Sequence, residues 1–392
     1  MWDWRQLRWA NKFGWWPKAA KTKYGQQMSR YWGLFLFAFD FSQLIPEFIA
    51  LYTIINEGSL KGTVTNLTTT LLGVLCAARV YFLIQKSDEI SLLIDSFAEL
   101  DSNILHHALG AEGKTIMANG DRRCKIITYT LVFGVISLLH WLLRPLILLL
   151  SHNVKTTIID IWVPWSFDNL GGWSAIYFVQ IVHVLSAVLG SFIFDSLFFC
   201  FSEMLITQLS LLSLALTKID FRKSHTIKLN RDLQAKDIEL ITLDKCIEFH
   251  CKLLRMVKVI TQIYDVIQIL QFVSLAAVIC LSIFEASSMD GVTLIKVINL
   301  IEMMITFVFF MFMYCYYSTM LVEKCQEIGR SAYMNNWYEG CLKDKKRLLM
   351  IIERSKKAPR FGMFLNVDLD TFITLLKSAF SYYNVLKAFV TD

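Results

Sequence analysis

The chain has 392 residues, of which 55% are hydrophobic and 18% charged, against roughly 25% charged in an ordinary soluble domain. Its mean hydropathy is +0.47, and it contains 29 Phe but only 5 Pro. These values exclude a disordered chain, a collagen, a secreted disulfide scaffold and a typical soluble enzyme, and they leave a membrane protein. The net charge of +6 is small, but the cations are unevenly distributed along the chain.

The first segment, residues 1–30, is basic and rich in tryptophan. Five Trp and six Lys or Arg are interleaved within its first 23 residues. Tryptophan at the headgroup boundary beside Lys and Arg is typical of an interfacial helix. We therefore expect this cytoplasmic segment to lie on membrane lipid; the alternative is a basic tail packed on a cytoplasmic domain.

Seven apolar stretches follow, each long enough to cross a hydrocarbon core of about 30 Å as a helix of roughly 20 residues. They cover residues 31–55, 64–84, 125–150, 174–216, 259–284, 292–318 and 369–390. At about 1.5 Å per residue the fourth stretch is roughly twice as long as a bilayer, so it should tilt or project into the cytoplasm. The sequence thus predicts an all-α protein with seven transmembrane helices, the first six within residues 31–318.

Lys and Arg concentrate in alternate connecting segments. Residues 1–29, 86–123, 213–257 and 319–367 hold 29 of them, whereas the opposite set of loops holds only Lys61 and Lys155. The positive-inside rule then places the N-terminus in the cytoplasm, and seven spans place the C-terminus outside the cell. This orientation is opposite to that of G-protein-coupled receptors, whose Asp-Arg-Tyr and Asn-Pro-x-x-Tyr motifs are also missing from the expected spans.

Two of the basic segments have helical patterns. Apolar residues between Ile238 and Ile260 recur with nearly helical spacing and run into the fifth span. In the segment 319–367, a shorter stripe of Leu and Ile at 348–352 stops before Pro359. Apolar faces on cytoplasmic helices must pack against something, so we expect residues 319–367 to supply anchor helices to a compact cytoplasmic domain.

Enzyme signatures are missing. The sequence contains no G-x-S-x-G, Walker A, H-E-x-x-H or C-x-x-C motif, so we expect no enzyme, no catalytic residue, no cofactor and no nucleic-acid partner. Cys246 and His250, four residues apart and next to Cys251, could offer two metal ligands, but no second pair is evident and we expect no metal site.

Charged residues inside the spans are costly unless they are paired or functional. Glu203, Asp265 and Glu302 are candidate partners of Arg79 or Lys296, with structural ion pairs as the simpler interpretation. Other charged residues inside the spans are Asp40, Glu47, Arg144, Asp195, Lys377 and Lys387.

Two spans have distinctive faces. In the third, Gly134, Ser137 and Trp141 share one helix face, which suits a cavity with an aromatic wall; the alternative is helix packing through small residues. In the last, polar or small residues recur at helical spacing from Thr374 to Ala388. A ring of such helices would line a pore, with Val385 as an apolar constriction that gates by dewetting.

Three runs near the C-terminus resemble the signature of insect odorant receptors. They are Ser331-Ala332-Tyr333 with Asn336-Trp337-Tyr338, the run from Ile351 to Pro359, and Thr371-Phe372 with the run from Leu376 to Tyr383. The resemblance implies an odorant-gated, non-selective cation channel in the plasma membrane of sensory neurons, with four subunits around one pore lined by residues 368–392. The loop between spans four and five is too short for the co-receptor Orco, so the chain resembles a tuning subunit that forms a heterotetramer with Orco.

The resemblance also implies site residues. A small volatile odorant would bind in the outer half of the bundle, between helices two, three, four and the five–six pair. Gly134, Ser137 and Trp141 would supply the third helix to this pocket. The other candidates are, on helix four, His183 and Ala187 and, on helix two, Cys76 and Val80.

The family's outer gate falls on Val385 with Leu386 beside it, and a polar position of the co-receptor falls on Ala388. Ser381 and Lys377 lie further along the same face towards the cytoplasm. A gustatory-type channel that works without a co-receptor is the alternative function, and a secondary transporter is a more distant one. Asn66, in an Asn-Leu-Thr sequence on the predicted outer side, is a candidate glycosylation site.

Overall fold

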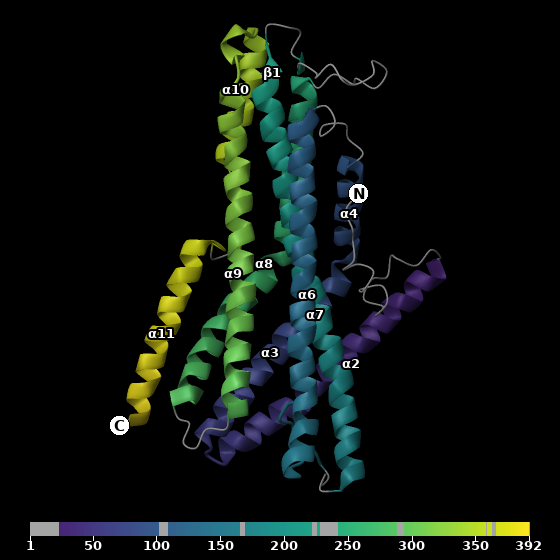
Figure 1. Ribbon diagram of the computed structural model, residues 1–392, viewed down its shortest axis with the longest axis vertical. Helices are drawn as coiled ribbons and strands as arrows, with labels where there is room; N and C mark the ends of the chain where they lie inside the picture. The colour runs from purple at the N-terminus through teal and green to yellow at the C-terminus, as the bar shows by residue number, and fades with distance from the viewer. Residues whose placement is uncertain are drawn as a thin grey trace.

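The computed structural model of the protein is a bundle of long helices with one minimal pair of strands (Figure 1). It describes residues 23–101, 109–164, 169–221, 226–227, 242–287, 294–357, 359–362 and 366–391. Most of the predicted interfacial segment, residues 1–22, lies outside the described residues. For Ser137, Val385, Leu386 and Ala388 the structure describes the backbone and not the side chain.

The elements follow one another along the chain as mostly long helices. They are α2 (Lys23–Asn56), α3 (Leu60–Gln85), α4 (Ser87–Asp101), α6 (Gly110–His152), α7 (Leu170–Lys218), β1 (Ile219–Asp220), β2 (Thr226–Ile227), α8 (Leu243–Ser287), α9 (Leu294–Tyr333), η2 (Trp337–Glu339), α10 (Leu342–Lys356) and α11 (Leu369–Thr391). The strands β1 and β2 pair antiparallel, Ile219 opposite Ile227.

The predicted spans fall in order on α2, α3, α6, α7, α8, α9 and α11. Within the described chain the first six of these are long and apolar enough to cross a membrane, judged by length and composition. Helix α11 has 23 residues and supplies the seventh. Side-chain caps fix two of the helix starts: the Ser59 hydroxyl accepts a hydrogen bond from the Gly62 N–H, and the Asn169 side chain accepts one from the Gly172 N–H.

Four helices are much longer than a bilayer requires. Helix α7 has 49 residues and spans roughly 70 Å, and α6, α8 and α9 have 43, 45 and 40 residues. They run side by side towards the end of the molecule that carries α10 and β1 (Figure 1). The expected boundary at residue 318 falls inside α9, because that helix continues without a break from the apolar stretch into the basic segment.

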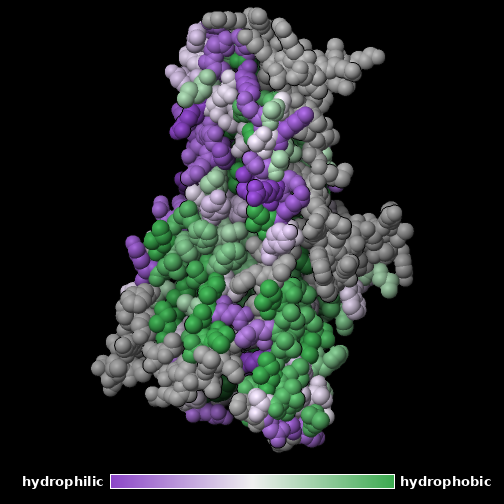
Figure 2. All heavy atoms as spheres, viewed as in Figure 1, coloured by the Kyte–Doolittle hydropathy of each residue, from purple (hydrophilic) through white to green (hydrophobic). Residues whose placement is uncertain are grey.

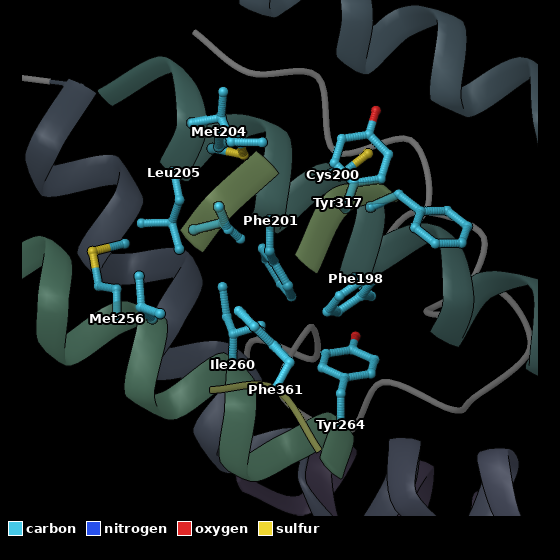
Figure 3. Packing of buried hydrophobic residues seen from close by; sticks show 14 of the residues in the cluster. Phe198, Cys200, Phe201, Met204, Leu205, Met256, Ile260, Tyr264, Tyr317 and Phe361 are labelled. Atoms are coloured by element: carbon cyan, nitrogen blue, oxygen red, sulfur yellow. The ribbon is translucent and has the colours of Figure 1, made fainter. Parts of the chain in front are cut away.

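An aromatic core holds α7, α8 and α9 together near the middle of the bundle (Figure 3). The ring centroid of Phe198 lies 4.9 Å from that of Tyr264 and 4.7 Å from that of Tyr314. These rings are fully buried. Phe361, from the segment between α10 and α11, joins them with its centroid 6.3 Å from that of Phe198.

The segment around Phe361 connects the basic end of the molecule to α11. The Gly362 N–H donates to Asp265 Oδ1 on α8 at 3.0 Å, and the Val367 N–H donates to the Phe361 carbonyl at 2.9 Å. Gly362 has φ +89°, in the left-handed region that glycine adopts without strain. The start of α11 is therefore fixed to the core of the bundle.

Apolar side chains cover the outside of the half that holds the predicted spans. On α6, Ile136, Leu139, Leu143 and Ile147 recur at helical spacing and are each about half exposed. Figure 2 shows the same division over one face: hydrophobic residues gather over the half away from α10, and hydrophilic residues gather around α10. A stripe of this kind is stable when acyl chains cover it.

Candidate ligand-binding site

A cavity of about 140 Å³ lies between α3, α6, α7, α8 and α9. Its wall is mostly apolar, with aromatic side chains from α6, α7 and α9. The residues that line it are Thr69, Leu72, Gly73, Cys76, Arg79, Leu138, Trp141, Ile158, Ile159, His183, Val184, Ala187, Val188, Ser191, Phe192, Asp195, Gln271, Met303, Thr306, Phe307 and Phe310. A cavity of about 150 Å³ in another protein holds benzene, so a ligand with one ring fits this space.

An ion pair forms one polar part of the wall. Arg79 Nε on α3 lies 3.0 Å from Asp195 Oδ1 on α7, and both side chains are more than nine-tenths buried. Arg79 Nη2 donates to the Gln271 side chain on α8, and the Tyr314 hydroxyl donates to Asp195 Oδ1 at 2.7 Å. The pair therefore joins α3, α7, α8 and α9. Both of its side chains also have a hydrogen-bond partner on another helix.

A second polar part of the wall is His183 on α7, which contacts acidic residues of α2 behind the wall. His183 Nδ1 lies 3.0 Å from Asp40 Oδ1, and the Ser186 hydroxyl donates to Asp40 Oδ2 at 2.8 Å. The other ring nitrogen of His183 lies 3.9 Å from Glu47 Oε1. Asp40 and Glu47 are both buried.

The segment after α6 covers the cavity on one side through Ile158 and Ile159. Gln180 fixes this segment from both sides: its oxygen accepts from the Ile158 N–H and its nitrogen donates to the Ile159 carbonyl, each at 2.8 Å. The Trp173 indole N–H donates to the Thr156 carbonyl at 2.9 Å. Since side chains of α7 bind its backbone groups, the segment forms a preformed cover.

The structure brings four of the predicted pocket residues to this cavity. Cys76, Trp141, His183 and Ala187 all line it. Val80 is fully buried in the helix packing and does not line it.

Gly134 acts on the cavity through a neighbour. A Cβ at Gly134 would stand 2.5–2.8 Å from ring atoms of Phe192, so only glycine lets that ring pack against α6. Phe192 in turn lines the cavity. For Gly134, therefore, the alternative interpretation of this face as helix packing through small residues holds. The Ser137 side chain is not described.

The structure bears on two suggestions about polar residues, and it contradicts the suggested partners of Arg79. Arg79 binds Asp195 instead of the three suggested acids. Those acids have other neighbours: Arg123 Nε lies 2.6 Å from Glu203 Oε1, His140 Nε2 lies 3.8 Å from Glu302 Oε2, and Asp265 accepts from the Gly362 N–H. The Lys296 side chain is not among those described.

The second suggestion concerns the candidate glycosylation site. The Asn66 side chain is 1% exposed, and its nitrogen donates to the Asp160 carbonyl at 3.0 Å. A buried amide in this position cannot receive a glycan. Asn66 instead fixes the segment after α6 to α3.

Helix α11 presents two different faces in this chain. Phe372 and Ala379 are buried against the bundle, and the Phe372 ring centroid lies 6.0 Å from that of Phe312 on α9. Thr374, Lys377 and Ser381 are exposed. The polar stripe expected to line a pore thus faces away from α8 and α9; the side chains of Val385, Leu386 and Ala388 are not described.

Residues 59–380 match the model of the 7tm odorant receptor family. The match covers most of the chain and all the helices that wall the cavity. The chain belongs to the odorant receptor family, which is not a family of enzymes, and its fold is the seven-helix membrane fold of that family.

Relatives with known names are distant in sequence. The chain is similar to putative odorant receptor 85d of Drosophila melanogaster, with 25% identity over 303 residues that cover 73% of this chain and 66% of that one. It is also similar to the odorant receptor coreceptor of Ooceraea biroi, with 22% identity over 142 residues that cover 36% of this chain and 30% of the other. The matches span just under two thirds of the first of these relatives and less than a third of the second.

Solved structures share the fold over almost the whole chain. The insect olfactory receptor OR5 from Machilis hrabei in complex with eugenol superimposes with a TM-score of 0.83 at 14% identity, over 98% of both chains. A second structure of OR5 from Machilis hrabei superimposes with a TM-score of 0.81 at 14% identity. This similarity shows the fold.

Proposed function

We propose that this chain is an odorant-gated, non-selective cation channel subunit that binds a small volatile ligand in the cavity between α3, α6, α7, α8 and α9. The observation that supports this proposal is the cavity itself. It is mostly apolar, has about the volume that one aromatic ring needs, and lies among the helices where the family resemblance places an odorant. The OR5 receptor of the same fold is described as a complex with eugenol, a ligand of this general kind.

The pore belongs to the same proposal. The exposed polar stripe of α11 suits a face that lines water when several subunits surround an axis. Similarity to the odorant receptor coreceptor of Ooceraea biroi supports assembly with a co-receptor subunit. The proposal places this channel in the plasma membrane of sensory neurons, with the N-terminus in the cytoplasm as the distribution of Lys and Arg predicts. A gustatory-type channel would need no co-receptor.

Recording with and without the co-receptor tests this function. The chain is expressed alone and together with the co-receptor, and volatile and soluble ligand panels are applied to whole cells. Current that requires both subunits and a volatile ligand supports the proposal. Current from the chain alone favours the gustatory alternative, and no current despite surface expression of both subunits contradicts a channel role.

A cavity-filling variant ties the current to the cavity. Ala187, which lines the cavity and is 4% exposed, is replaced by Phe, and Ala38, which is exposed on α2, receives the same change as a control. Ala187→Phe should abolish or shift ligand responses by more than tenfold, while Ala38→Phe leaves them unchanged. Overpacking costs about 1–3 kcal/mol, so surface labelling accompanies each recording.

A further inference from the structure

A buried carboxylate without a hydrogen-bond partner adjoins the cavity. Glu47 on α2 is 1% exposed, and within the described residues neither of its carboxylate oxygens has a hydrogen-bond partner. Its neighbour Asp40, in contrast, binds His183 and Ser186. Burial of a polar group without a partner is costly, and for an ionised carboxylate the cost is greater.

Two cavity residues lie directly against this carboxylate. His183 Nε2 is 3.9 Å from Glu47 Oε1. A Cβ built at Gly73 would stand 3.3 Å from Oε2 and 3.8 Å from Oε1. Gly73 and His183 both line the cavity, and Glu47 lies directly behind them without lining it. Because Gly73 has no side chain, no Cβ stands between its backbone and the carboxylate.

With every group counted as ionised, the cavity wall and the residues directly behind it carry unequal numbers of positive and negative charges. Three carboxyl groups, Asp40, Glu47 and Asp195, face two groups that can be cationic, Arg79 and His183. Arg79 is occupied by Asp195 and by Gln271. Even with His183 protonated between Asp40 and Glu47, one negative charge is left over.

We propose that the ligand of this cavity is a small amine, bound as its ammonium ion with an N–H group directed at Glu47. An ammonium group offers three donors and supplies the missing positive charge. The rest of the ligand occupies the apolar part of the cavity beside Trp141, Phe307 and Phe310, which has room for one ring. This inference rests on the proposed function, since it names the ligand class of the same cavity.

Four ligands of nearly equal size test the charge requirement. Benzylamine, benzyl alcohol, benzaldehyde and toluene are applied to cells that express the chain with the co-receptor. Benzylamine should activate at a concentration at least tenfold lower than any of the other three. Equal or greater potency of the alcohol overturns the amine proposal, and greater potency of benzaldehyde overturns it in favour of a protonated Glu47 that donates a hydrogen bond.

The same panel separates this proposal from the proposed function. A neutral ligand that gives current while benzylamine gives none overturns the amine proposal and leaves the odorant-gated channel intact. A wide volatile panel that gives no current, with both subunits at the surface, overturns the channel function instead.

Glu47→Gln tests the residue itself, because glutamine keeps the shape of the side chain and removes the charge. Loss of a hydrogen bond between charged groups should raise the half-activating concentration of benzylamine roughly tenfold or more. Benzyl alcohol should shift less than threefold. Glu57→Gln, an exposed position just after α2, is the matched control and should shift neither ligand.

Equal shifts for benzylamine and benzyl alcohol in Glu47→Gln would overturn a charge-specific role. Surface labelling shows whether the variant reaches the membrane. The comparison of ligands on the unmodified chain needs no variant and decides the amine proposal in either case.

Discussion

Trp141 is a half-buried wall of the cavity whose indole is not fixed by charged partners. Trp141→Ala would remove an aromatic contact worth about 0.5–1.5 kcal/mol beyond area burial, which corresponds to a shift of up to about tenfold in potency. We expect altered potency or rank order across an odorant panel, with the channel still assembled and open to some ligand. Dose–response recording measures the effect.

Trp32→Ala is the matched control for this change, because Trp32 on α2 is 52% exposed and away from the cavity lining. It should leave the odorant panel unchanged. Identical curves for Trp141→Ala and the unmodified chain would assign Trp141 to helix packing alone.

The buried pair of Arg79 and Asp195 should be much more sensitive. Asp195→Asn leaves the Arg79 guanidinium buried without its counter-charge, a change that costs about 3–5 kcal/mol in a buried ion pair. We expect the surface amount of the receptor to fall sharply and its melting temperature in detergent to drop.

Glu89→Gln offers a comparison within the same chain. Glu89 pairs with Lys86 at 3.0 Å, but both side chains are partly exposed, and such pairs contribute about 1 kcal/mol or less. Its surface amount should stay normal. Normal surface expression and stability of Asp195→Asn would contradict a structural role for the buried pair.

The sequence could predict parts of this site but not its pairings. Helical spacing brings Gly134 and Trp141 to one face, and the family resemblance implies His183 and Ala187 as pocket residues on the fourth span. Spacing within one helix cannot reveal the rotation of that helix against another. For this reason the partner of Arg79 was predicted wrongly, although both Arg79 and Asp195 stood out as intramembrane charges. Gly73, in the middle of the second span, is the one sequence feature that indicates the close approach of α2 to α3 at this point.

At the scale of elements, α11 separates an apolar face from a polar one. Phe372 and Ala379 are buried against the bundle, and Thr374, Lys377 and Ser381 are exposed. A face of this kind is expensive in contact with lipid, so other subunits or water should cover it. This supports the proposal that α11 lines the pore.

A pore-lining α11 predicts three different outcomes. Val385→Ala should ease opening or raise basal current, because a smaller apolar ring holds back water less well. Lys377→Gln should raise cation conductance or alter block, because a lysine two turns from the constriction repels cations. Lys387→Gln, one residue off this face, should do less and serves as the control.

Single-channel recording of these variants with the co-receptor measures conductance and open probability separately. If none of the three differs from the unmodified chain, α11 does not present this face to the ions.

The long helices could be predicted because an apolar stretch of membrane length can cross a bilayer as a single segment only when it is helical. The same argument missed α4, which lies in a segment treated as a connection. Ile90, Leu93, Phe97 and Leu100 are buried there at helical spacing, so the signal was present but shorter than a span. It also missed the start of α6, where residues 110–124 are too polar to be recognised by hydropathy and are held by packing on α7.

At the scale of the whole molecule, the described basic parts of α8, α9 and α10 gather at one end. Figure 1 places α10 and β1 together there, and it places the connection between α6 and α7 at the other. The C-terminal end of α11 points towards that second end, away from α10. The hydrophilic residues around α10 in Figure 2 agree with this division. Because Lys and Arg concentrate on the cytoplasmic side of membrane proteins, the end with α10 should face the cytoplasm.

This arrangement predicts the location of both termini. With α10 in the cytoplasm and seven spans, an epitope tag after Asp392 should be labelled by antibody on unpermeabilised cells. A tag before Met1 is the matched control and should be labelled only after permeabilisation. The reason is the same for both tags, since the split of 29 Lys and Arg against 2 between alternate connecting segments predicts the orientation of the whole bundle. Labelling of the tag after Asp392 only in permeabilised cells would reverse the orientation, and the polar end of α11 would then face the cytoplasm.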